Sequence, residues 1–253
     1  MFPLKDNIPT DRTPFVTIAL IAINVFVYFV LQKGGILSGP SDSGVVHYGA
    51  IPYEITHPGQ QCDISPDGRF IQCGQGLGGP STIVTVITAM FMHGSILHLG
   101  GNMLFLWIFG NNVEDAMGHV RFAIFYLLGG IAALALQTAI QPNAAIPTVG
   151  ASGAIAAVLG GYILLYPRAR VVTVIFIVFF FTILELPAMA VLGLWFLQQV
   201  AFGYFDLANP AGGGGGGVAY FAHIGGFAFG LLTIKLFANR QKDYTVPPKY
   251  PVY

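Results

Sequence analysis

The sequence predicts an all-α membrane protein built as a bundle of six transmembrane helices. Hydrophobic residues make up 55% of the 253-residue chain and charged residues only 9%, whereas a soluble domain carries about 25% charged residues. Such a chain has too few charged residues to form the surface of a water-soluble fold, and it is too hydrophobic to be intrinsically disordered. The 11 Lys and Arg residues balance the 11 Asp and Glu residues, so no net positive charge is present to bind nucleic acid.

Six apolar runs approach the roughly 20 residues that a helix needs to cross about 30 Å of hydrocarbon. They cover residues 15–32, 96–109, 121–139, 152–167, 186–204 and 218–238. An apolar lead-in, 171–184, precedes the fifth run. We therefore expect a cytoplasmic segment 1–14, one membrane domain 15–238 with an outer loop 33–95, and a cytoplasmic tail 239–253.

The positions of the basic residues predict the orientation of the bundle. If the N-terminus is cytoplasmic, nine of the 11 Lys and Arg residues lie on the cytoplasmic side, and only Lys33 and Arg69 lie outside. Cytoplasmic loops of helical membrane proteins carry an excess of Lys and Arg. The distribution therefore predicts that both termini are cytoplasmic.

The long outer loop contains both cysteines of the chain. Cys62 and Cys73 flank Pro66-Asp67-Gly68, a sequence typical of a turn. A hairpin there would bring the two thiols together on the side of the membrane that is usually oxidising. The sequence predicts a disulfide, with two unpaired thiols in an irregular insert as the alternative. A separate glycine run, 212–217, precedes the last span and predicts either a linker or a mobile lid.

Four polar side chains in the apolar runs are candidates for catalysis, because polar groups in membrane segments are costly. Ser152 follows Gly150 at the start of the fourth run, and His223 lies near the start of the sixth. His98 and Asn102 share one helix face in the second run. Taken singly, such a serine commonly bonds a backbone carbonyl, and His or Asn commonly joins two helices. Together they supply the nucleophile, the general base and the oxyanion donors of acyl transfer.

Two stripes of small residues predict that the fourth and sixth runs pack closely. The stripes are Ser152, Ala156 and Gly160 in one run and Ala222, Gly226 and Gly230 in the other. Small residues that recur every four positions lie on one helix face and let two helix backbones approach each other closely. A hydrogen bond between Ser152 and His223 is therefore geometrically reasonable. Because the fourth run is short for a span, we expect Ser152 to lie below the membrane surface, beside a water-filled cavity.

These motifs resemble those of the rhomboid family of intramembrane serine proteases, over nearly the whole chain from Pro14 to about Leu236. The matching stretches are 49–52, 91–93, 98–102 with Gly110 and Glu114, 150–153, and 222–230. Each stretch is short, but their combination and order are specific. The resemblance implies a rhomboid-like bundle of six spans in which Gly153, Gly226 and Gly230 pack the helices.

The resemblance also implies a serine protease with a Ser–His dyad. Ser152 would be the nucleophile and His223 the general base, while Asn102, His98 and the backbone N–H of Ser152 would bind the oxyanion. The substrates would be transmembrane proteins cut in or beside a membrane helix, and neither a metal nor a cofactor is expected. Some relatives carry Tyr four residues after the nucleophile, where Ala156 stands here. The orientation of His223 must then come from another residue.

The fifth run carries Trp195 and Phe196, and two interpretations of this pair stay open. Either both rings face lipid, or this span is a lateral gate through which the substrate enters. Two other functions also stay open: a catalytically inactive rhomboid-like binder of membrane proteins, and a channel for small solutes. We expect an integral multi-pass protein of a bacterial or archaeal plasma membrane, whose partners are its substrates and the lipid bilayer.

Overall fold

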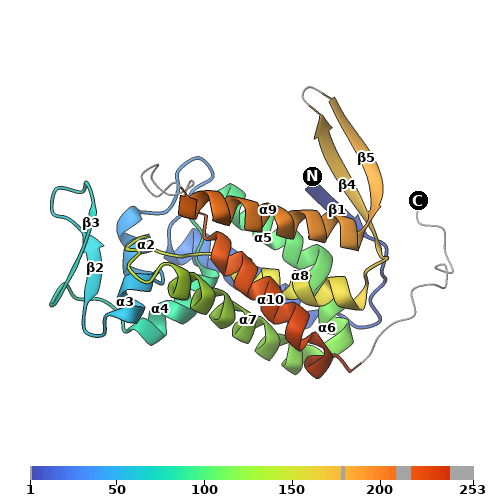
Figure 1. Cartoon of the computed structure of the whole chain (residues 1–253), viewed down its shortest axis with the longest axis horizontal. Coiled ribbons are helices and arrows are strands. Elements are labelled where there is room, and N and C mark those ends of the chain that lie inside the picture. Colours follow the sequence, from blue (N-terminus) through green and yellow to red (C-terminus); the bar gives the residue numbers. More distant parts are fainter. Residues whose placement is uncertain (1, 178–179, 209–217, 240–253) are drawn as a thin grey trace.

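The computed structural model describes residues 2–177, 180–208 and 218–239 (Figure 1). The glycine run at 212–217 and residues 240–253 of the predicted tail lie outside the described residues. Most of the described chain is helical. Its helices are α1 (Phe15–Phe26), η1 (Val27–Leu31), α2 (Asp42–Tyr48), α3 (Pro52–Thr56), α4 (Thr82–Thr88), η2 (Ala89–Phe91), α5 (Ile96–Phe105), η3 (Leu106–Gly110), α6 (Asn111–Met117), α7 (His119–Ile140), α8 (Ser152–Leu165), α9 (Ala188–Ala208) and α10 (Tyr220–Phe237).

Three of these helices, α7, α9 and α10, have the length and hydropathy of a membrane span. A fourth span results if Thr82–Phe91 and Ile96–Met117, which are bent by 79° relative to each other, are counted as one. Two further apolar helices, Phe15–Leu31 and Ser152–Leu165, are shorter. The described residues thus contain three or four spans by these criteria, and the six-span count stays a prediction.

The expectation of an all-α protein is wrong in one respect, because the described residues also form two small antiparallel sheets. The larger sheet joins β1 (Phe2–Asp6), β4 (Arg170–Ile177) and β5 (Phe180–Pro187) in the order β1-β4-β5. The apolar lead-in 171–184 therefore forms strands over its described residues, 171–177 and 180–184. Its β-branched and aromatic side chains favour that conformation.

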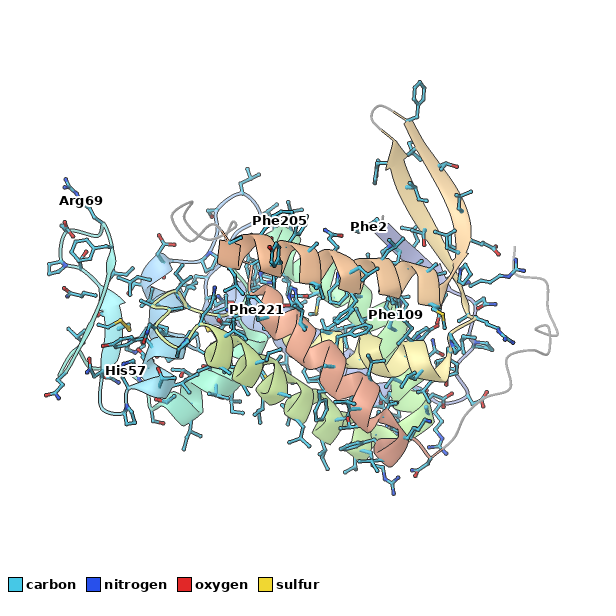
Figure 2. All side chains as sticks on the ribbon, in the orientation of Figure 1. Phe2, His57, Arg69, Phe109, Phe205 and Phe221 are labelled. Atoms are coloured by element: carbon cyan, nitrogen blue, oxygen red, sulfur yellow. A yellow bond between two sulfur atoms is a disulfide. The ribbon has the colours of Figure 1, made fainter. Side chains whose placement is uncertain are left out.

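The second sheet lies in the predicted outer loop, at the end of the molecule beyond α2 and α3 (Figure 1). Strands β2 (Gln61–Ile64) and β3 (Ile71–Gly74) form a hairpin in which Cys62 and Cys73 are direct partners and are joined by a disulfide. Figure 2 shows Arg69 at the far end of this hairpin, away from the helices. The disulfide therefore closes a peripheral hairpin of the loop.

The centre of the bundle is α8, which packs against α7 and α10. A Cβ placed on Gly226 would overlap the carbonyl oxygen of Gly153, and one on Gly230 would overlap that of Ala157. The two helix backbones therefore touch along the stripes of small residues. This contact holds together the starts of α8 and α10.

The N-terminal strand is attached to the other end of α8 by a buried carboxyl group. Asp6 accepts a hydrogen bond from the hydroxyl of Tyr162 at 2.5 Å and another from Nδ2 of Asn112 at 2.7 Å. Burial raises the pKa of the Asp6 carboxyl to about 6. The strand is thus fixed to α6 and α8 by a group that can titrate near neutral pH.

Candidate active site

Ser152 is the first residue of α8, and Gly150 shapes the loop that precedes it. The φ angle of Gly150 is 132°, in a region that residues with a side chain rarely adopt. A Cβ at Gly150 would also lie 2.8 Å from Nε2 of His98. Glycine therefore lets the loop approach His98. It also leaves the Ser152 hydroxyl at a helix N-terminus, where unpaired N–H groups can bind an anion.

Ser152 and His223 meet where α8 and α10 begin. The Oγ of Ser152 lies 2.8 Å from Nε2 of His223, and both side chains are half-buried. His223 lies in the first turn of α10, next to the glycine contact that joins the two helices. A hydroxyl and an imidazole at hydrogen-bond distance are the geometry of a nucleophile and its general base.

The other ring nitrogen of His223 has a partner that the sequence did not predict. Its Nδ1 lies 2.8 Å from Oε1 of Gln199 on α9, and Gln199 is only 5% exposed. Because an amide oxygen can only accept, Nδ1 carries the ring proton, and Nε2 is free to accept the proton of Ser152. The Nε2 of Gln199 donates to the carbonyl oxygen of Trp195 at 3.3 Å, which fixes the orientation of the amide.

Gln199 thus supplies the contact that Ala156, with its methyl side chain, does not provide. The signal for it in the sequence was a polar residue within the fifth apolar run. That run contains two adjacent glutamines, and the structure shows that Gln198 is exposed whereas Gln199 is buried. Hydropathy alone does not distinguish the two.

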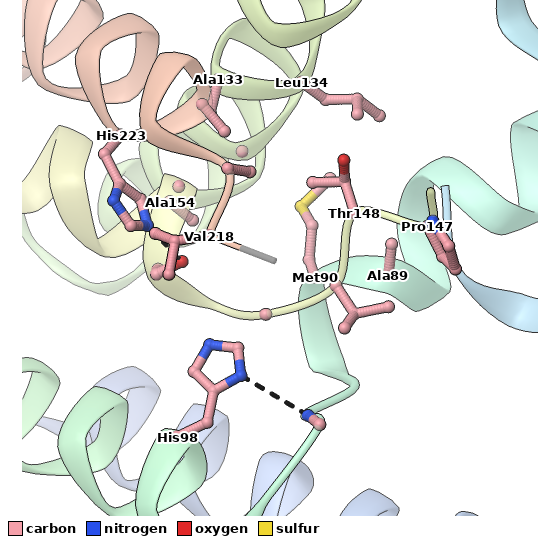
Figure 3. A pocket seen from close by; sticks show the side chains of 18 of the residues that line it. Ala89, Met90, His98, Ala133, Leu134, Pro147, Thr148, Ala154, Val218 and His223 are labelled. Atoms are coloured by element: carbon pink, nitrogen blue, oxygen red, sulfur yellow. Dashed lines mark hydrogen bonds between the residues drawn. The ribbon is translucent and has the colours of Figure 1, made fainter. Parts of the chain in front are cut away.

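His98 faces His223 from the opposite side of one cavity (Figure 3), whereas Asn102 does not line that cavity. The Nδ1 of His98 accepts a hydrogen bond from the N–H of Gly94 at 3.5 Å. Asn102 is 8% exposed, and within the described part of the chain its buried Nδ2 has no hydrogen-bond partner. A buried donor without an acceptor is costly, so this amide would gain from an anion that reaches it.

The cavity that contains Ser152, His223 and His98 has a volume of about 480 Å³, which is within the usual range for ligand pockets. One wall is the loop 147–150, which is fixed to the predicted outer loop. Ala50 and Thr148 exchange two backbone hydrogen bonds of 3.2 and 2.8 Å. Within the described residues, no group of three or more His, Cys, Asp or Glu side chains could hold a metal ion.

Trp195 and Phe196 pack against α10. The rings of Phe196 and Phe227 are stacked with their centroids 4.5 Å apart. The ring of Trp195 lies 5.7 Å from that of His223 and 6.1 Å from that of Phe227. Trp195 therefore lies beside His223, whereas Phe196 holds α9 against α10, and the function of the pair as a gate stays a prediction.

The sequence is similar to three eukaryotic proteins whose names contain the word rhomboid. It is 32% identical over 157 residues to Rhomboid protein 1, mitochondrial, of Saccharomyces cerevisiae, covering 59% of this chain and 40% of that protein. It is 32% identical over 152 residues to RHOMBOID-like protein 4 of Arabidopsis thaliana, covering 58% and 32%. It is 27% identical over 155 residues to Presenilin-associated rhomboid-like protein, mitochondrial, of Mus musculus, covering 59% and 37%. The matches thus span less than half the length of each relative.

These relatives correct the predicted location. All three come from eukaryotes and two are named mitochondrial, so the prediction of a bacterial or archaeal plasma membrane is wrong. The prediction that both termini are cytoplasmic assumed that membrane, so it is withdrawn as well. The distribution of Lys and Arg can favour one orientation over the other, but it cannot identify the membrane.

A profile of the Rhomboid domain matches residues 80–240, which is more than half of the chain. The chain belongs to the rhomboid family.

Proposed function

We propose that this protein is an intramembrane serine endopeptidase, which hydrolyses peptide bonds in or beside the transmembrane helices of other membrane proteins. The observation that carries the proposal is the 2.8 Å distance between Oγ of Ser152 and Nε2 of His223. Family membership supports the same chemistry. The partners in this proposal are transmembrane substrates, and the reaction requires neither a metal nor a cofactor.

In the first half of the reaction, Nε2 of His223 removes the proton from Oγ of Ser152 as Oγ attacks the carbonyl carbon of the substrate. The protonated imidazole then donates to the leaving amine, and an acyl group remains on Ser152. In the second half, His223 activates a water molecule that hydrolyses this ester. Gln199 keeps the ring proton on Nδ1, so Nε2 has a lone pair for both transfers.

The negative oxygen of the tetrahedral intermediate needs donors near Ser152. The backbone N–H of Ser152 at the start of α8 is one donor, and the imidazole of His98 on the opposite side of the cavity is another. Asn102 adds a third if its unpaired Nδ2 turns toward the intermediate. Donors held in place before the reaction stabilise such an oxyanion by several kcal/mol, about 3–4 for a single donor in one well-studied protease.

The test is cleavage of a reporter transmembrane helix by the purified protein in lipid vesicles, together with labelling by a fluorophosphonate that reacts with activated serines. We expect Ser152→Ala to abolish labelling and to lower kcat by roughly 10³- to 10⁶-fold. Ser81→Ala is the matched control, because Ser81 also lies where a helix starts, directly before α4, and its side chain makes no capping hydrogen bond.

Ser152→Ala protein that cleaves at the wild-type rate would overturn the proposal. Wild-type protein that binds the reporter helix, but neither cleaves it nor reacts with the fluorophosphonate, would instead identify an inactive binder of membrane proteins.

A further inference from the structure

Strands β4 and β5 form an arm that extends from the bundle. Each strand is eight residues long, or about 26 Å at the usual rise per residue. Figure 1 shows the arm leaving the bundle where α9 begins and pointing away from the helices. Within the described residues, strand β1 pairs with residues 171–174 of β4 and with no others, so beyond residue 174 the described part of the arm consists of β4 and β5 alone.

The character of the side chains changes along the arm. Near the bundle, Arg170 and Glu185 form an ion pair at 3.4 Å, and both are exposed. Farther out, residues 174–183 include no charged residue. Among the described side chains of this stretch, the most exposed are large and apolar: Phe176 is 68% exposed, Phe180 78% and Phe181 68%.

These phenylalanines lie on both faces of the arm. Phe176 and Phe181 are direct partners across the two strands, so they share one face. Phe180 is adjacent to Phe181 in β5 and therefore points to the opposite face. A hairpin in water presents at least one polar face, whereas this hairpin presents apolar side chains on both. The outer part of the arm is thus suited to an apolar medium that surrounds it.

We propose that the outer part of the arm inserts into the lipid bilayer, with its charged base at the level of the headgroups. The arm is continuous with apolar helices at both ends: α8 ends at Leu165 shortly before β4, and α9, which has the length and hydropathy of a membrane span, begins at Ala188 directly after β5. The base is therefore held near the membrane surface, and lipid is the apolar medium within reach. Phospholipid headgroups and the upper parts of the acyl chains are the partner.

The depth of insertion follows from two lengths. The outer four residues of each strand span about 13 Å, which is close to the thickness of one hydrocarbon leaflet, about 15 Å. The free edges of the two strands keep unpaired backbone groups, which are costly in the centre of a bilayer. Inserted straight, the outer end of the arm would reach the bilayer centre, where these groups would be costly. The arm therefore lies at the interface, with its phenylalanines among the first acyl carbons, and it anchors the end of α9 that is remote from His223.

Nitroxide spin labels on single introduced cysteines test this proposal. The chain has two cysteines, both in the disulfide, so Phe176→Cys and Phe181→Cys each provide one free thiol. Glu185→Cys, in the same strand as Phe181 but at the base, is the matched control. The protein is reconstituted in vesicles of phosphatidylcholine and phosphatidylglycerol, and collisions with oxygen, which enters lipid, are compared with collisions with a water-soluble nickel chelate. We expect the oxygen-to-nickel ratio to be several-fold higher at 176 and 181 than at 185.

Two results would overturn the proposal. Equal ratios at all three positions would place the arm in water. Exclusion of both reagents at 176 and 181 would place it against protein, and dilution into excess lipid would reveal whether that protein is a second copy of this chain. The readout requires no proteolysis, so it succeeds or fails independently of the proposed function.

Discussion

The imidazole of His223 is held by two hydrogen bonds, one to Ser152 and one to Gln199, each 2.8 Å long. Without Gln199, a buried Nδ1–H lacks an acceptor, and the ring can take the tautomer in which Nε2 is protonated. Such a loss costs about 1–3 kcal/mol. We therefore expect Gln199→Leu to lower kcat for a soluble peptide by roughly 10- to 100-fold. KM should change little, and steady-state cleavage in detergent micelles measures both.

Two variants control for structural damage at this position. Gln199→Glu keeps an oxygen acceptor for Nδ1 and should retain most of the activity. Gln198→Leu changes the exposed neighbour on the same helix and should cleave at the wild-type rate. If Gln199→Leu and Gln198→Leu have the same kcat, His223 needs no acceptor at Nδ1.

At this scale, the sequence predicted that Ser152 and His223 approach each other, as the structure shows, but it did not predict the partner of the second ring nitrogen of His223. Ser152 and His223 were predicted because each lies in a short motif near a predicted helix start. The orienting role of Gln199 was not predicted, because it depends on the rotation of α9 relative to α10. That rotation is set by packing contacts such as Phe196 on Phe227, which hydropathy does not encode.

At the scale of elements, α9 is the helix whose attachment bears on substrate entry. Phe196 stacks on Phe227 of α10, Gln199 bonds His223, and Gln141 donates a hydrogen bond to Asp206 at 3.0 Å. If α9 is the lateral gate, an entering substrate helix must break some of these contacts. Opening would also withdraw Gln199 from His223, so the dyad would be fully oriented only after the gate closes again.

Phe196→Val tests the gate, because it removes the ring stack and leaves Gln199 in place. One aromatic pair is worth about 0.5–1.5 kcal/mol, so opening should become roughly 2- to 10-fold more favourable. We expect cleavage of a membrane-embedded substrate to rise by a similar factor relative to cleavage of a soluble peptide. Leu197→Ala, at a side chain that is 62% exposed, is the control. An unchanged ratio of the two rates would contradict lateral entry past α9.

At the scale of the whole molecule, the sequence predicted the apolar helices better than it predicted what joins them. Long apolar runs are a strong signal for membrane helices, and α7, α9 and α10 meet that expectation. The run 171–184 is equally apolar, but periodicity cannot separate a short buried helix from a strand. Its pairing with β1, which lies at the other end of the sequence, is a long-range contact that no local pattern predicts.

That long-range contact makes the stability of the molecule depend on pH through Asp6. Its pKa rises from 3.8 in a model compound to about 6 in the folded protein, because burial disfavours the charged carboxylate. The folded state therefore holds more protons than the unfolded state between these values. This contribution to stability is complete below about pH 4 and is lost as the pH rises through about 6. Asp6 is only 8% exposed, and the shift of its pKa corresponds to about 3 kcal/mol in the free energy of unfolding.

Asp6→Asn removes the titrating group but keeps an oxygen that can accept from Tyr162. We expect the melting temperature of the wild type in detergent to decline from about pH 4 to about pH 7, and the decline to be much smaller in Asp6→Asn. Asp42→Asn, at an exposed aspartate, should follow the wild-type profile. Parallel profiles for wild type and Asp6→Asn would mean that Asp6 is already ionised in the folded protein at pH 4. The N-terminal strand would then be held by an ion rather than by a neutral carboxyl group.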